Sequence, residues 1–432
     1  MDVRRRFYVL IMLKKFSFAK TLVLLCTVVY FASYFSRKSF AAVMVAMLDQ
    51  GAVERHTAGL IGTALFIFYG LGQVFSGLLG DRFSAKILLP VGLFVSAVCN
   101  FLLPLIKTDF LMIGIWGLNG LAQALLWPPI VRLLSENLPH EKYVTANLIV
   151  TCGAHVATIL LYLYTTICLQ FFTWETVFFT ATAICVLVGV VFFFALSKTV
   201  SGIEFSQKNT HTGTENASKP LLSTFFDSGL IYVFVCIIAM GFLRDGIESW
   251  LPTLYSEAFS RNASESVLVS VALPIFSIVS ILLIRIVHKN KFFNNETRGA
   301  IVLFLLSVAL CVPLGLLINQ DGAFCRVLCL ILACAACACM HACNFLFISC
   351  VPGRFSQSGR TSSIGGFCNA FTYVGAAGST YGIALLSERL GWSATAFSWA
   401  GISLIGVLFA LLALKKYTAF LHSTDPEQKE EN

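Results

Sequence analysis

VFFTATAICVLVGVVFFFALS, residues 177–197, contains no charged side chain. A helix of about 20 apolar residues crosses the ~30 Å hydrocarbon core of a bilayer and satisfies its own backbone hydrogen bonds there. Equally uncharged stretches occur at 301–318 and 391–414. Of the 432 residues, 57% are hydrophobic and 12% are charged, and the mean hydropathy is +0.82. Soluble domains carry about 25% charged residues, so the pattern indicates a chain that crosses a membrane many times.

The apolar stretches predict an all-α membrane protein with twelve transmembrane helices. We place them near residues 18–47, 58–80, 87–106, 110–134, 144–168, 174–197, 226–254, 266–287, 299–319, 324–350, 361–386 and 391–414. The interior segment 199–225 is polar and rich in turn-forming residues, and it separates 1–198 from 226–432. Each half then holds six helices, the layout of a transporter with two structural repeats around a midplane site.

The distribution of basic residues predicts the orientation. Of the 30 lysines and arginines, three lie deep within predicted helices, and most of the others fall on the side of the two termini. The loops of the opposite side hold Arg55, Lys107, Arg261, Arg326 and Arg389. Cytoplasmic loops of membrane proteins are enriched in these residues, so we expect both termini in the cytoplasm and a multi-pass protein of the cell inner (plasma) membrane. The net charge of +8 is then a topology signal, and no nucleic-acid partner is expected.

Charges deep in apolar stretches are the strongest functional signal. Arg37 and Lys38 lie in FASYFSRKSF, and Arg244, Asp245 and Glu248 lie in AMGFLRDGIESW. A charge at the bilayer centre costs about 2.5–3.5 kcal/mol, so such residues usually face a cavity or a partner. Pseudo-symmetry would place the two arginines face to face, because each lies in the first helix of its half. Two guanidiniums around one cavity suit a phosphate or carboxylate, which accepts forked hydrogen bonds.

A structural role is the alternative interpretation of these charges. Lys38 with Glu248, or Arg244 with Glu248 four residues further on, would form a neutralising ion pair. Asp245 is turned about 100° from Arg244 around the helix, so we do not expect it to share the cavity.

Short motifs occur along nearly the whole chain. They are Tyr30-x3-Tyr34-x2-Arg37-Lys38-x-Phe40, Gln123-x3-Trp127-Pro128-Pro129-x2-Arg132, Cys152-x-Ala154-His155, Leu243-Arg244-x-Gly246-Ile247-x2-Trp250-x-Pro252 and Tyr373-Val374-Gly375. Together they resemble the first, fourth, fifth, seventh and eleventh helices of the organophosphate:phosphate antiporters. This family is a branch of the major facilitator superfamily that includes bacterial glycerol-3-phosphate and hexose-6-phosphate transporters.

The resemblance implies the major facilitator fold, with two pseudo-symmetric six-helix bundles, and roles for the matching positions. Arg37 and Arg244 would hold the phosphate, and protonation of His155 in the cavity would strengthen its binding. The other substrate-binding positions would be Lys38, Glu248, Tyr30, Tyr34, Tyr69, Gln123 and Tyr373. The alternative for His155 is a histidine packed between helices, and for the tyrosines, packing or anchoring at the membrane interface.

A further motif, Gly77-x3-Asp81-Arg82-x3-Lys86, resembles the superfamily's loop between its second and third helices. The resemblance implies that Asp81 and Arg82 act in gating by latching the two halves in one state. The chain differs from the family at Gln73, where a lysine is common, and in 266–284, which carries no acid.

The tenth predicted helix carries a competing signal. Residues 334–343 read CAACACMHAC, which places Cys334, Cys337 and His341 on one helical face. Thiolates and imidazole could bind a soft metal, whereas small residues in membrane helices commonly serve close packing. We expect packing here, with no metal and no other cofactor, and with His341 and Asn344 as alternative cavity residues.

These features predict a secondary transporter that imports a small organophosphate, glycerol 3-phosphate or a sugar phosphate, in exchange for inorganic phosphate. A membrane sensor of sugar phosphate with the same fold, and a proton-coupled carrier of another organic anion, are the alternatives. No glycine directly precedes a lysine, so the sequence has no GK[ST] phosphate loop and implies no ATP. It also lacks HExxH and GxSxG, so we expect no enzyme. The expected state is a monomer in the lipid bilayer.

Overall fold

The computed structural model describes residues 3–82, 84–200, 221–288, 290, 292–320, 322–358 and 360–424. These residues are almost entirely helical, and the described part contains no β-strand. Most of the polar segment predicted at 199–225 lies outside this part. Its last residues begin the short helix α8 (Leu221–Asp227).

Seven α-helices make up most of the first half of the chain as far as the structure describes it. They are α1 (Val3–Asp49), α2 (Arg55–Arg82), α3 (Ala85–Leu102), α4 (Asp109–Ala124), α5 (Trp127–Asn137), α6 (His140–Phe171) and α7 (Glu175–Val200). The sequence predicts one helix at 110–134, but the structure divides it into α4 and α5. Proline at the first turn of α5 explains the restart, because a helix needs no amide hydrogen there.

The second half contains α9 (Leu230–Ala258), α10 (Ala263–Val269), α11 (Ala272–Val287), α12 (Glu296–Leu317), α13 (Ala323–Asn344) and α14 (Thr361–Thr424). Between α13 and α14 lie a π-helical segment (Phe345–Cys350) and a 3-10 segment (Val351–Ser358). α14 is two helices that meet at Gly391, whose φ of 78° is left-handed. Glycine adopts this conformation without a steric penalty, so the predicted boundary between the last two helices coincides with this turn.

Ten segments of the described chain are long and apolar enough to cross a membrane. One of them, Ser363–Ser423, contains both helices of α14, and α2 adds another crossing. The described residues therefore provide the twelve crossings that the sequence predicts. Large apolar side chains such as Phe110 and Phe324 are more than 70% exposed, which suits a surface covered by lipid.

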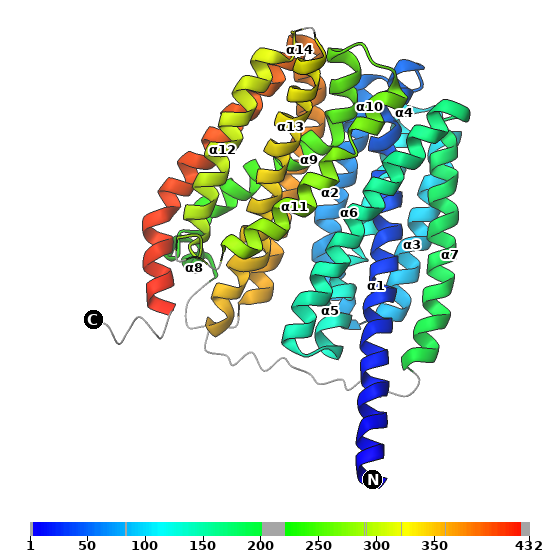
Figure 1. Cartoon of the computed structure of the whole chain (residues 1–432), viewed down its shortest axis with the longest axis vertical. Helices are drawn as coiled ribbons and strands as arrows, with labels where there is room; N and C mark the ends of the chain where they lie inside the picture. Colours follow the sequence, from blue (N-terminus) through cyan, green and yellow to red (C-terminus); the bar gives the residue numbers. More distant parts are fainter. Residues whose placement is uncertain are drawn as a thin grey trace.

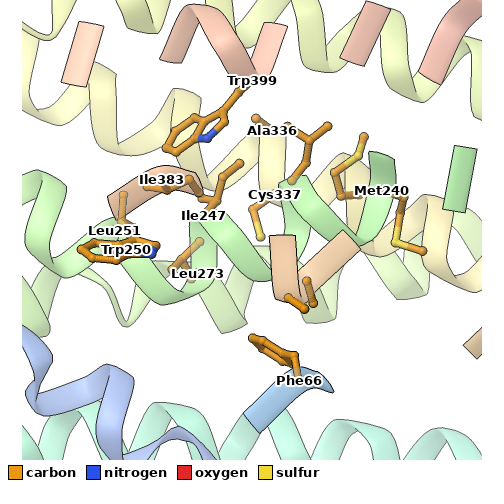
Figure 2. Packing of buried hydrophobic residues seen from close by; sticks show 14 of the residues in the cluster. Phe66, Met240, Ile247, Trp250, Leu251, Leu273, Ala336, Cys337, Ile383 and Trp399 are labelled. Carbon is orange, nitrogen blue, oxygen red and sulfur yellow. The ribbon is translucent and has the colours of Figure 1, made fainter. Parts of the chain in front are cut away.

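The helices form two bundles. In the first, α1 packs against α6 and α7, α3 packs against α4 and α7, and α2 packs against α4. In the second, α9 and α12 pack against both α13 and α14. Figure 2 shows Ile247, Trp250 and Leu251 of α9 in one apolar cluster with Ile383 and Trp399 of α14. α9 is thus held within the second bundle on several sides.

The two bundles meet at the end of the molecule opposite the two termini, which we call the closed end (Figure 1). There Arg55 of α2 donates hydrogen bonds to Glu257 and to the Ser387 hydroxyl. Nearer the midplane, the Thr63 hydroxyl donates to the Ala377 carbonyl at 2.8 Å. Toward the termini the axes of the two bundles diverge (Figure 1). The molecule is therefore sealed on one side of the midplane.

Gly59 lies where α2 packs closely against α14. A Cβ atom there would lie 2.8 Å from the Cβ of Ala384 and 3.2 Å from the Thr380 carbonyl oxygen. We expect Gly59→Leu to oppose sealing of the closed end by about 1–3 kcal/mol, the usual range for overpacking. Such an energy shifts the equilibrium between the sealed and open forms of the closed end roughly 5–150-fold toward the open form. Hydrogen–deuterium exchange in residues 55–66 and 377–390 should therefore rise.

Gly241→Leu is the matched control. A Cβ at Gly241 would lie 2.2 Å from the Thr372 carbonyl within the second bundle, so this variant should lose folding stability instead. Unchanged exchange at the closed end in Gly59→Leu would contradict the assignment of this contact as a seal.

Candidate functional site

Charged side chains from both bundles meet where α1 passes α9. The Lys38 Nζ of α1 lies 2.5 Å from Oε2 of Glu248 on α9. The other carboxylate oxygen, Oε1, lies 2.7 Å from Nε2 of His341 on α13. One carboxylate thus joins the first bundle to two helices of the second, and the ion pair considered as the structural alternative is present.

Arg244 is 8% exposed and is held within its own bundle. Its Nη1 donates to Oδ1 of Asn344 at 2.6 Å, and its Nη2 donates to Oδ2 of Asp245 at 2.6 Å. Asp245 therefore shares the site, in contrast to the orientation expected from its position on the helix. The long arginine side chain folds back to reach the neighbouring residue.

Arg37 is buried to a similar degree, at 7% exposed, but its surroundings differ. Its guanidinium carbon lies 4.7 Å from the ring centre of Tyr34 and 5.0 Å from that of Tyr69. Its Nε is buried without a hydrogen-bond partner. No ion pair or hydrogen bond joins this side chain to any residue that the structure describes. Cation–π contacts supply part of the lost solvation, but they bring no negative charge.

We call Arg37, Lys38, Arg244, Asp245 and Glu248 the central cluster. It contains three cations and two carboxylates, so these five side chains together carry one uncompensated positive charge. Taking an unpaired charge out of water costs several kcal/mol even after relaxation. An anion bound beside these side chains would offset that charge.

The tyrosines predicted from the sequence gather on one side of this cluster. Tyr69 and Tyr373 contact each other across the two bundles, with ring centres 4.4 Å apart and planes tilted by 53°. Tyr373 lies within electrostatic range of both guanidinium groups, those of Arg37 and Arg244. Tyr30 lies one layer further away, with its ring 4.9 Å from Tyr34 and 4.7 Å from Trp127. Tyr34, Tyr69 and Tyr373 thus surround Arg37, and Tyr30 supports them.

The structure brings His155 to the cluster and places Gln123 elsewhere. The ring of His155, on α6, lies 5.3 Å from that of His341 across the bundles. Gln123 is fully engaged inside the first bundle, where it accepts from Ser33 at 2.5 Å and donates to Ser96 at 2.8 Å. Its contribution is to fix α4 against α1 and α3.

A pocket opens beside Arg37 and Lys38 toward the closed end. Its other lining residues are Phe40, Ala41, Met44, Ala58, Gly62, Leu65, Phe66, Trp116, Ser249, Trp250 and Thr380. The lining is mostly apolar and aromatic. The sequence did not identify Phe66, Trp116 or Thr380 as lining residues, because apolar residues in a membrane helix carry no signal that separates a pocket from the core.

Two groups of described residues have the geometry to hold a metal ion: Glu248 with Cys337 and His341, and His288 with Glu296 and Cys350. Cys334, predicted to share a face with Cys337 and His341, belongs to neither group. The side chains of Asp81 and Arg82, predicted to act in gating, lie outside the described part of the structure.

Comparison with known proteins identifies relatives of the whole arrangement. The family model described as Major Facilitator Superfamily matches residues 26–378. A probable hexose phosphate transport protein of Chlamydia trachomatis is 26% identical over 162 residues, which is 38% of this chain and 36% of that protein. The glycerol-3-phosphate transporter of Bacillus subtilis is 24% identical over 301 residues, covering 66% of this chain and 67% of that one.

Two further likenesses complete the comparison. The membrane sensor protein UhpC of Escherichia coli is 32% identical over 106 residues, 24% of each chain. The crystal structure of the D323A mutant of the nucleoside transporter NupG superposes with a TM-score of 0.69 at 14% identity. It covers 92% of this chain and 99% of that one. The structural likeness shows the fold, and the sequence likenesses place the chain near proteins named for phosphorylated sugars and glycerol 3-phosphate.

Proposed function

Because this chain belongs to the Major Facilitator Superfamily, we propose that it is a secondary transporter for a small organophosphate, which it exchanges for inorganic phosphate. The relatives named as a hexose phosphate transport protein and a glycerol-3-phosphate transporter support this substrate class. The matched stretch covers only 36% of the first of these, so the proposal depends on the site itself.

The observation that carries the proposal is the unpaired guanidinium of Arg37. A membrane protein that buries a cation without a counter-ion bears the part of the desolvation cost that cation–π contacts do not offset until an anion arrives. Phosphate is a suitable anion because its oxygens accept forked hydrogen bonds, and Arg244 in the second bundle offers further donors. Lys38 adds a further positive charge beside the proposed phosphate site, and Tyr373 adds a hydroxyl group. The apolar pocket beside Arg37 is small in this state and would widen to receive the organic part of the ester.

The same charge arrangement accounts for exchange. A phosphate that contacts both Arg37 and Arg244 favours the conformations in which α1 and α9 are close, and this differential affinity drives the bundles together. When the site is empty, its positive charge stays uncompensated, and the protein changes slowly between its outward-open and inward-open states. Each change of state therefore requires a bound substrate. The bundles 1–198 and 226–432 would be the moving units, the segment 199–225 their connection, and Asp81 and Arg82 part of the latch.

We further propose that both termini face the cytoplasm and that the protein is a monomer in the plasma (inner) membrane. The excess of lysine and arginine on the side of the termini supports this orientation. The closed end then faces outward, and substrate leaves or enters the described state from the cytoplasm.

Phosphate self-exchange in proteoliposomes tests the function. We expect labelled phosphate inside the vesicles to leave only when phosphate or a phosphate ester is present outside. Glycerol 3-phosphate and hexose 6-phosphates should compete at the site, and uncharged glycerol or glucose should not. Exchange that is insensitive to every phosphate ester would contradict the proposed substrate class.

A sensor is the second candidate, and the likeness to UhpC favours it. Both candidates require the anion site, but only the transporter requires the bundles to cycle. Saturable phosphate binding by the purified protein, with no exchange in vesicles that contain it, would identify the sensor.

A further inference from the structure

We propose that Glu248, Cys337 and His341, with His155 as a fourth ligand, form a binding site for a borderline-soft divalent cation such as Zn²⁺. The candidate ligand atoms of the first three residues all lie within 4.8 Å of one another. Cys337 and His341 lie one turn apart on α13, and Glu248 faces them from α9. This site goes beyond the organophosphate function, because it binds a cation and does not require that function.

The geometry of the two histidines suits a shared metal. In a tetrahedral zinc site each imidazole nitrogen lies about 2.0–2.1 Å from the metal, which puts the centres of two bound rings about 5 Å apart. The rings of His155 and His341 are 5.3 Å apart and inclined at 75°. Both rings are buried away from competing water.

The ligand chemistry also balances. Thiolate, imidazole and carboxylate are all zinc ligands, and thiolate selects soft cations over magnesium or calcium. Binding converts the Cys337 thiol to a thiolate, and its proton leaves to solvent. The carboxylate of Glu248 and this thiolate then offset the two charges of the ion. Because the ion brings two positive charges and one proton leaves, binding raises the net charge of the site by one.

A bound cation would change how the bundles move. His155 belongs to the first bundle, whereas Glu248, Cys337 and His341 belong to the second. An ion held by all four fixes α6 against α13 and stabilises the described arrangement, so zinc should inhibit cycling. The ion also competes with Lys38 for Glu248, since Lys38 Nζ lies 2.5 Å from that carboxylate.

The second group of candidate ligands is less suited to a cation. The Arg354 Nε donates to Oε1 of Glu296 at 2.9 Å, and the Tyr417 hydroxyl donates to Oε2 at 3.0 Å. Neither Arg354 nor Tyr417 is a candidate ligand, so both carboxylate oxygens of Glu296 are held by groups outside the set, whereas Oε1 of Glu248 is held by the candidate ligand His341. We assign no site to His288, Glu296 and Cys350.

Cobalt binding tests the site, because a thiolate bound to Co²⁺ gives a charge-transfer absorption band independent of transport. We expect the purified full-length protein to show this band with one ion per chain, and excess Zn²⁺ to remove it. Cys337→Ala should abolish the band. Cys334→Ala, the same change one turn away on α13, and Cys350→Ala in the second group should both keep it.

Lys38→Met provides a second measurement that does not depend on loss of the band. Removing the competing cation should tighten zinc binding by at least about tenfold, because a unit charge at this distance interacts strongly even at an effective dielectric constant of 20. The proposal is overturned if the wild-type protein shows no thiolate band or if the band survives in Cys337→Ala. Unchanged or weaker zinc binding in monodisperse Lys38→Met would also overturn it.

Discussion

Arg37→Lys is expected to abolish phosphate exchange while leaving the protein folded. Lysine keeps the charge but presents a compact ammonium group that cannot make the forked contact of a guanidinium with two phosphate oxygens. Loss of one charge-assisted pairing in a buried binding site costs about 2–5 kcal/mol, which weakens phosphate binding by at least roughly 30-fold. Proteoliposome exchange measures the transport effect.

The surroundings of Arg37 make this result specific. Its side chain has no ion pair or hydrogen bond with any described residue, so the substitution breaks no protein contact of that kind. The thermal midpoint in detergent should therefore stay within a few degrees of wild type. Exchange at the wild-type rate would refute the role of Arg37, and a collapse in stability would show that the residue is structural.

Arg244→Lys is the second substitution with a severe expected effect, and it should behave differently. Arg244 donates to both Asn344 and Asp245, so lysine loses the fork toward phosphate and also leaves a buried acceptor unsatisfied. An unsatisfied buried polar group costs about 1–3 kcal/mol. We expect exchange to be lost and the thermal midpoint to fall, in contrast to Arg37→Lys.

Arg261→Lys is the matched control for both variants. Arg261 pairs with Glu265 at 3.4 Å on the surface of the closed end, where an ion pair contributes at most about 1 kcal/mol. This variant should exchange phosphate and melt like wild type. If Arg244→Lys exchanges phosphate at the same rate as Arg261→Lys and the wild type, the second bundle does not hold the anion through Arg244.

Much of the fold follows from hydropathy, because the bilayer requires each crossing to be a long apolar helix. The sequence therefore predicts twelve crossings and places the turn near Gly391. It does not predict the interruption between α10 and α11, where the stretch 266–287 reads as one helix. Pro274 in the first turn of α11 has no amide hydrogen to donate to the Ser270 carbonyl, and hydropathy does not separate a proline that kinks a helix from one that ends it.

The burial of the two central arginines is also predictable, since a charge in an apolar stretch must find a polar environment. The partners of the buried charged residues are not predictable in the same way. Arg244 contacts Asn344, which is 100 residues away in the chain, and Glu248 contacts His341, which is 93 residues away. Helical spacing fixes which residues share a face of one helix but not which helices face each other. The pairing of Arg244 with Asp245 further depends on side-chain length, which a helical-face argument ignores.

Binding of labelled phosphate to the purified protein tests the central claim, that two arginines from different bundles form one anion site. We predict one phosphate per chain, displaced by glycerol 3-phosphate. Arg37→Lys, Arg244→Lys and the double variant should all lose binding to a similar extent, because one anion needs both groups at once. Full phosphate binding in the double variant would contradict the account.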